Sequence, residues 1–97
     1  MSNPPEIATH LQPSERLARM KFRAWHRGTR EADYMLGGFF DRYHAEWEEQ
    51  ALQWFEALLD EDDVDAMAWA LQTQTPPERF SGPLMVALRK LDYVQIG

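Results

Sequence analysis

The hydrophobic and polar positions of the chain repeat with the period of an α-helix from residue 15 onward. Leu17, Met20 and Ala24 are spaced three or four residues apart and form one apolar stripe, while arginine and lysine fill much of the remaining surface. This spacing predicts an amphipathic helix from residue 15 to about residue 27, with Ser14 as its N-cap. No segment alternates apolar and polar residues over a length that would form a strand.

A second helix is predicted directly after a glycine. Gly28 has no Cβ and therefore tolerates the left-handed conformation that ends many helices, and Thr29 can cap the helix that follows. The apolar residues of this second helix again recur at helical spacing, and they are Tyr34, Met35, Phe39 and Tyr43. The pair Gly37-Gly38 should weaken the middle of the helix by roughly 1 kcal/mol per glycine.

Three further helices are predicted between breaks in the apolar pattern. They are a helix from about Glu46 to Leu59, a helix capped by Asp62 or Asp63 after an acidic turn, and a helix from Leu84 to about Leu91 that begins near Pro83. The fold class predicted from this pattern is all-α, a small bundle of five short helices. We expect residues 1–13 to form a flexible N-terminal tail, residues 14–92 a single helical domain, and residues 93–97 a C-terminal tail.

The length and composition of the chain restrict the class of protein further. With 97 residues, 44% of them hydrophobic and 12% aromatic, the chain can form one small core. The absence of cysteine from the sequence excludes disulfide bonds and thiolate zinc sites. No stretch approaches the ~20 apolar residues that cross a bilayer, and the first residues do not show the pattern of an export signal. We therefore expect a soluble, cytoplasmic protein that does not insert into a membrane.

Charge is distributed unevenly along the sequence, although the net charge is only −6. Residues 1–30 hold six basic and two acidic side chains, whereas residues 31–78 hold thirteen acidic side chains and the single Arg42. A chain that is acidic overall binds nucleic acid poorly, because neutralisation of phosphates supplies most non-specific affinity. We interpret the basic segment as a local feature of one helix, and we expect no nucleic acid partner.

Candidate metal ligands and catalytic groups do not form a recognisable pattern. The three histidines have no ligand spacing, and the acidic run 60–65 has Asp65 where a calcium-binding EF-hand loop needs glycine. The sequence has no Walker or dinucleotide-binding loop, and no pair of carboxylates is placed in an apolar pocket for acid–base work. We expect no metal and no catalytic residue. Trp25 and Trp47 have charged neighbours on both sides and are expected to be the most exposed tryptophans.

The most distinctive motif lies where the first two helices meet. Arg27, Gly28 and Glu31 form an RGxxE sequence that contains Arg30. A corner glycine lets the backbone of a partner come close, an arginine offers a two-pronged hydrogen-bond donor, and a nearby glutamate is an acceptor. The alternative is that the motif is only a helix boundary. That reading explains the glycine, but it explains the flanking charges less completely.

The motif and its surroundings resemble the succinate dehydrogenase flavinylation factors, also called FAD assembly factors. The similarity covers about residues 14–72. It consists of a basic helix with Arg16, Arg23 and Trp25, the RGxxE sequence, Asp33, the pair Phe39-Phe40, the segment from Phe55 to Leu59, and Asp63 and Asp65 followed by Trp69. The sequence departs from the family pattern at Thr29, Ala32, Glu48 and Val64.

The resemblance implies a small chaperone-like assembly factor that is not an enzyme. Such a factor binds the flavoprotein subunit of succinate dehydrogenase or fumarate reductase and promotes covalent attachment of FAD to a histidine of that subunit. It would act on the FAD of its partner without binding FAD stably itself, and we expect it to be a monomer when free. By the same resemblance, Arg27, Gly28 and Glu31 face the partner, with Trp25 and Arg30 as their neighbours. A second and weaker set of residues, which the resemblance leaves open to a structural role, is Asp63, Asp65 and Trp69.

Two other functions stay open on the sequence alone. A small helical regulator, such as an antitoxin-like protein, would use the basic helix on another macromolecule, and salt-sensitive binding of RNA or DNA would favour it. A carrier of FAD would need a nucleotide-binding loop, which the sequence does not contain.

Overall fold

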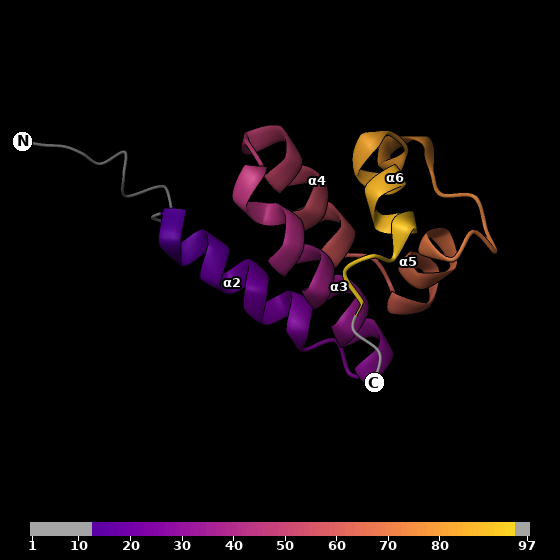
Figure 1. Ribbon diagram of the computed structural model, residues 1–97, viewed down its shortest axis with the longest axis horizontal. Helices are drawn as coiled ribbons and strands as arrows, with labels where there is room; N and C mark the ends of the chain where they lie inside the picture. Colours follow the sequence, from indigo (N-terminus) through magenta and orange to yellow (C-terminus); the bar gives the residue numbers. More distant parts are fainter. Residues whose placement is uncertain (1–12, 95–97) are drawn as a thin grey trace, which may run out of the picture.

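The computed structural model describes residues 13–94, which form five α-helices joined by short connections (Figure 1). The helices are α2 (Pro13–Trp25), α3 (Arg30–Tyr43), α4 (Glu49–Leu59), α5 (Asp63–Ala70) and α6 (Pro83–Lys90), with 3₁₀ turns at His44–Glu46 and Glu78–Phe80. No residue of the described range lies in a strand. The predicted fold class, a small all-α bundle of five short helices, is confirmed.

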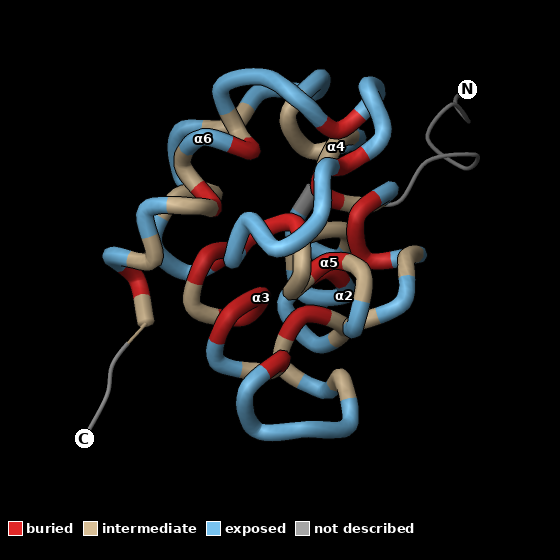
Figure 2. Tube along the Cα trace, turned by 90° about the vertical axis from the view of Figure 1, so that its right-hand side faces the viewer, coloured by how far each residue is buried: buried red, intermediate tan, exposed pale blue. Residues whose placement is uncertain are grey.

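Helix α3 is the element around which the other helices are arranged. Helix α2 packs along α3 and α4, α5 packs on α3, and α6 packs on α5. Figure 1 shows α2 running along one side of α3 and α4, with α5 and α6 beyond them. The helical period turns six residues of α3 into the interior, and they are Ala32, Met35, Leu36, Gly37, Phe39 and Phe40. The buried stretches of the helices face one another across this interior (Figure 2).

Phe39 lies at the centre of an aromatic core. Its ring centroid is 5.1 Å from that of Tyr43, 5.3 Å from that of Tyr93 and 5.8 Å from that of Phe55. These separations are those of edge-to-face and offset aromatic pairs, and burial of one such side chain stabilises a fold by about 1.5–3 kcal/mol. Phe39 therefore joins α3 to α4 and to the segment that follows α6.

Trp47 is less exposed than the sequence predicts. Its ring lies 5.2 Å from Phe55 and 5.6 Å from Phe39, so the indole covers the aromatic core. The backbone of Trp47 is extended, with φ −81° and ψ 136°, and α4 therefore begins at Glu49 and not at the predicted Glu46. The ring thus packs on the core at a position where the sequence predicts the first turn of a helix, and this long-range contact is not visible in local sequence signals.

The glycine pair in α3 has a structural reason. The indole of Trp25 lies directly on Gly37, where an added Cβ would be 2.3 Å from its Cδ2 atom. At Gly38, an added Cβ would be 2.9 Å from the carbonyl oxygen of Tyr93. Each glycine thus permits a close approach to the helix backbone that any side chain would block. The pair gives up helix propensity so that α2 and the C-terminal segment can pack tightly on α3.

The ends of the domain differ from the predicted ends. Helix α2 begins at Pro13, so Ser14 lies in its first turn and is not the cap; proline suits this position because its fixed φ is helical. Tyr93, placed in the predicted C-terminal tail, is buried, and its hydroxyl donates to the carbonyl of Leu88. The predicted tail residues 1–12 and 95–97 lie outside the described residues. Within the described range, no helix has the length and apolar character needed to cross a membrane.

We predict that Gly37→Ala destabilises the fold because its Cβ must displace the indole of Trp25. The displacement should cost about 1–3 kcal/mol, more than the ~1 kcal/mol that alanine gains over glycine in a helix. In a Trp25→Ala background the same substitution should become stabilising, since the space is then free. Urea unfolding of the four proteins measures this change of sign. A stabilising Gly37→Ala in the wild-type background would contradict the close packing.

Candidate partner-binding site

The corner between α2 and α3 is built by two residues whose roles the sequence predicts correctly. Gly28 has a φ of +116°, in the left-handed region that favours glycine, and an added Cβ there would meet no atom within 4 Å. The hydroxyl of Thr29 accepts a hydrogen bond of 3.2 Å from the backbone N–H of Ala32 and so caps α3. The backbone conformation therefore requires glycine here, and the space outside Gly28 is open.

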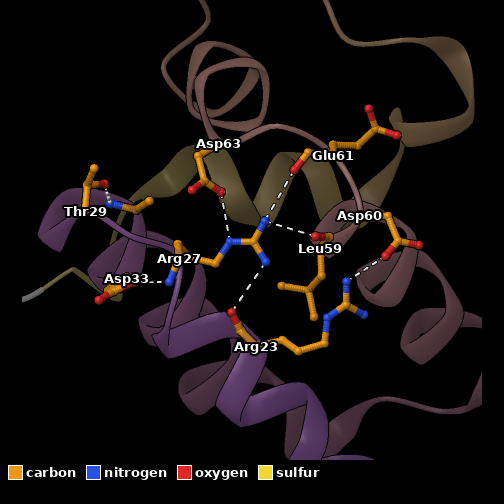
Figure 3. A network of polar contacts seen from close by, with 9 residues as sticks. Arg23, Arg27, Thr29, Asp33, Leu59, Asp60, Glu61 and Asp63 are labelled. Carbon is orange, nitrogen blue, oxygen red and sulfur yellow. Dashed lines mark hydrogen bonds and ion pairs between the residues drawn. The ribbon is translucent and has the colours of Figure 1, made fainter.

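The side chain of Arg27 points into the protein and not toward solvent (Figure 3). Its Nε donates to Oδ1 of Asp63 over 2.8 Å, and its Nη2 donates to the carbonyl oxygens of Leu59 at 2.9 Å and Glu61 at 3.3 Å. Only 11% of the side chain is exposed. The guanidinium thus fills the turn between α4 and α5 and satisfies carbonyl groups at the end of α4.

The backbone of the corner is also held by hydrogen bonds. The N–H of Arg27 donates to Oδ1 of Asp33 over 2.6 Å, and the N–H of Asp33 donates to the carbonyl of Thr29 over 3.0 Å. Asp33 therefore bridges the two sides of the turn from the first turn of α3, where a carboxylate also suits the helix dipole. The conformation around Gly28 is fixed by contacts from both helices.

The second set of sequence-predicted residues divides into three different environments. Asp63 is the ion-pair partner of Arg27, so the structure brings the two predicted sets together at this pair. Trp69 is buried in the core, with its ring 5.3 Å from that of Phe80. Asp65 is half-buried in the first turn of α5. Asp63 thus supports the corner and Trp69 the core.

The remaining residues of the motif are available at the surface. Gly28, Arg30 and Glu31 are exposed, and within residues 13–94 neither Arg30 nor Glu31 has a hydrogen bond or ion pair from its side chain. Trp25 is half-buried, and its indole N–H donates to Asp41 over 3.2 Å. Among the described residues, the corner thus presents an unpaired cation and an unpaired carboxylate on a backbone held by contacts from both helices.

Two open depressions adjoin the corner and meet at Tyr34. One, of about 570 Å³, is lined by His26, Gly28, Thr29, Arg30, Asp33 and Tyr34. The other, of about 560 Å³, is lined by Trp25, Tyr34, Gly38, Asp41, Arg42, Asp92 and Tyr93. Sequence reasoning did not identify His26 and Tyr34 as site residues, although the exposed aromatic Tyr34 stands one turn from Arg30. Together the depressions extend the candidate site along α3.

The basic residues of α2 mainly face acidic residues of the same chain. Arg16 pairs with Glu49 at 2.6 Å and with Glu56 at 2.8 Å, and Arg23 pairs with Asp60 at 2.6 Å. Hydrogen bonds from Arg16 and then Gln53 lower the pKa of the Glu49 carboxyl. With Arg27 and Asp63, these pairs form a row of ionic contacts along the side of α2 that faces α4. The uneven charge of the sequence is therefore used largely inside the fold.

The polar and charged side chains of the described range lie at or near the surface. None of the polar or charged residues in the described range is buried. No three histidine, aspartate or glutamate side chains of that range come together as a metal site.

The fold and site define a small helical protein whose candidate functional surface is a rigid, exposed corner between two helices. Residues 18–92 match the family described as flavinator of succinate dehydrogenase. The chain therefore belongs to this family, as the RGxxE resemblance indicates.

Individual relatives agree with this assignment. The chain is 34% identical over 74 residues to the mitochondrial succinate dehydrogenase assembly factor 2 of Cryptococcus neoformans, an alignment that covers 75% of this chain and 42% of the relative. It is 33% identical over 70 residues to the FAD assembly factor SdhE of Acetobacter pasteurianus, covering 72% of this chain and 64% of the relative. The chain thus spans less than two thirds of the length of these relatives.

We predict that Arg27 and Asp63 are energetically coupled. Arg27→Ala should lower the free energy of unfolding by about 2–4 kcal/mol, because it leaves the Asp63 carboxylate and two carbonyl groups without their donor. A double-mutant cycle with Asp63→Ala should give a coupling of about 1–3 kcal/mol. The more exposed pair Arg23–Asp60 is the matched control and should give less than about 1 kcal/mol. Equal coupling energies in the two cycles would contradict the anchoring role of Arg27.

Proposed function

We propose that this protein binds the flavoprotein subunit of succinate dehydrogenase or fumarate reductase and promotes covalent attachment of FAD to that subunit. The observation that carries the proposal is a family match over residues 18–92 combined with an RGxxE corner whose Arg30 and Glu31 are exposed and unpaired in the described structure. The relatives carry the names of assembly factors, and this chain is proposed to share their role.

The partner surface is proposed to consist of Gly28, Arg30 and Glu31, with Trp25 at its edge and Arg27 behind it. Gly28 lets a partner backbone approach the corner, and Glu31 accepts hydrogen bonds from it. Arg27 contributes by holding these residues in place from inside, since its donors are already bound to the chain. A surface that does not have to be ordered on binding loses less free energy when a complex forms.

The factor is proposed to act without a catalytic group and without a stably bound FAD. Attachment of the flavin uses the chemistry of the cofactor and of the flavoprotein, so the helper needs only to favour the reactive conformation of its partner. We further propose that the free chain is a monomer and that it works in the cytoplasm.

The ion pairs of the basic helix argue against the alternative function, a regulator that binds nucleic acid through this helix. Arg16, Arg23 and Arg27 are occupied by carboxylates of α4 and α5 and of the turn between these helices. Releasing them to reach phosphates would expose those carboxylates beside the nucleic acid, where like charges repel. The assembly role requires no such rearrangement.

We predict that Glu31→Ala leaves the protein folded and reduces its helper activity. In a strain that lacks the gene, the flavoprotein subunit should accumulate with little covalent flavin, and wild-type protein should restore the flavin fluorescence of that subunit in a denaturing gel. Glu31→Ala should fail to restore it. The substitution should cost only about 0.3–1 kcal/mol of stability, through the loss of a carboxylate near the helix N-terminus.

Glu48→Ala is the matched control for this experiment. Glu48 is also exposed, and it precedes α4 without forming a side-chain cap. It lies at the N-terminal end of α4, next to the Glu49 that pairs with Arg16, and not at the corner between α2 and α3. It should restore covalent flavin fully. Unchanged covalent flavin in the deletion strain would refute the proposed function, whereas full rescue by Glu31→Ala would refute only the site.

We also predict that the purified protein does not bind FAD. Mixed with micromolar FAD, it should leave the flavin fluorescence and its anisotropy unchanged, because the depressions on its described surface are open and no nucleotide-binding loop is present in the sequence. Formation of a stoichiometric yellow complex would instead identify the protein as a carrier of FAD.

A further inference from the structure

One large aromatic residue on α2 is exposed beside the corner. The side chain of Phe22 is 61% exposed, although most other large apolar residues of the described range are buried or half-buried. Its ring stacks on that of His26, with the centroids 4.0 Å apart and the planes at 18°. His26 also lines the depression at the corner, together with Gly28 and Arg30. Phe22 therefore extends the candidate site along the outer side of α2.

One face of the Phe22 ring is supported by His26. The Nδ1 of His26 lies 2.7 Å from the carbonyl oxygen of Phe22, and because a carbonyl can only accept, Nδ1 carries the proton. This bond fixes the imidazole one helical turn from Phe22, where it supports one face of the ring. An exposed aromatic side chain that is already ordered loses little conformational entropy when a partner covers it.

The charge of this face differs from the charge of the whole chain. Arg19 lies one turn before Phe22 on α2, and Arg30 follows the corner. Both are exposed, and within residues 13–94 neither has a carboxylate partner. By contrast, Arg16 and Arg23 of α2 are paired with acidic residues of α4 and of the turn that follows it, and Arg27, just after α2, is paired with Asp63 of α5. The outer side of α2 thus carries an aromatic ring one turn from Arg19, and Arg30 lines the adjoining depression with His26; both cations are unpaired within the described residues, on a chain with a net charge of −6.

We propose that Arg19, Phe22 and His26 form a second part of the docking surface, which binds an apolar pocket rimmed by carboxylates on the flavoprotein subunit. The inference rests on the proposed function and specifies the chemistry of the partner. Charge complementarity selects an acidic rim for Arg19 and Arg30, and the ring of Phe22 needs an apolar pocket. Aromatic residues and arginine are the side chains that most often dominate binding at the centre of an interface.

The experiment measures binding of the full chain to the purified flavoprotein subunit of succinate dehydrogenase from the same organism, by calorimetry at several salt concentrations. Phe22→Ala should raise the Kd by about tenfold or more, as loss of a central aromatic anchor does. Arg19→Gln should raise the Kd and flatten its dependence on salt, because one ionic contact is lost. Val86→Ala and Lys90→Gln, which alter exposed residues of α6, should bind like the wild type.

The outcomes separate this inference from the proposed function. If Phe22→Ala and Arg19→Gln bind normally while Glu31→Ala does not, the inference is overturned and the proposed function stands. If the wild-type chain forms no complex with the subunit, both are overturned. Light scattering of the free proteins provides a further test, since a dimer that Phe22→Ala dissociates would assign this face to a second copy of the chain. If the wild-type chain instead formed a salt-sensitive complex with RNA, and of the variants only Arg19→Gln failed to form it, the inference would likewise be overturned.

Discussion

The contact between Arg27 and the turn joining α4 to α5 is the constraint on which the site depends. A single guanidinium connects the end of α2 to Asp63 and to two carbonyl oxygens, so it fixes the first two helices relative to the next two. The corner at Gly28 could turn in many directions if it were held only by its own backbone. With Arg27 and Asp33 in place, it has one orientation, and the exposed residues beside it have fixed positions.

Most charged side chains of α2 are, like Arg27, paired within the chain. A basic helix followed by a strongly acidic segment looks in sequence like a cationic arm, but in the fold α2 lies against α4 and its arginines meet carboxylates there (Figure 1). Pairs of this kind at a partly exposed boundary stabilise a protein only modestly, and their larger effect is to set which faces meet. Within residues 13–94, the cation left unpaired on the outside of α2 is then Arg19, with Arg30 across the corner.

The sequence was sufficient wherever the determining signal is local. The helix count, the left-handed Gly28, the cap by Thr29 and the proline at the start of α6 all follow from neighbouring residues. Contacts between distant segments could not be read in this way. The inward direction of Arg27 depends on Asp63, which is 36 residues away, and the glycine at position 37 depends on the indole of Trp25. The sequence reveals the motif, but only the fold shows which of its residues face outward.

The inward direction of Arg27 has a consequence for how lesions in this protein would appear in a cell. Substitutions at neighbouring positions of one short motif would impair the protein in different ways, by loss of stability or by loss of binding. A chain that loses its anchor at position 27 or 63 spends more time unfolded, and proteases would reduce its abundance. Under the proposed function, a chain altered at Glu31 would keep its normal abundance, and it would not displace intact copies from the partner because its own binding is weakened. Two variants with the same metabolic defect would therefore be distinguished by an immunoblot, and only the first kind would respond to lower growth temperature.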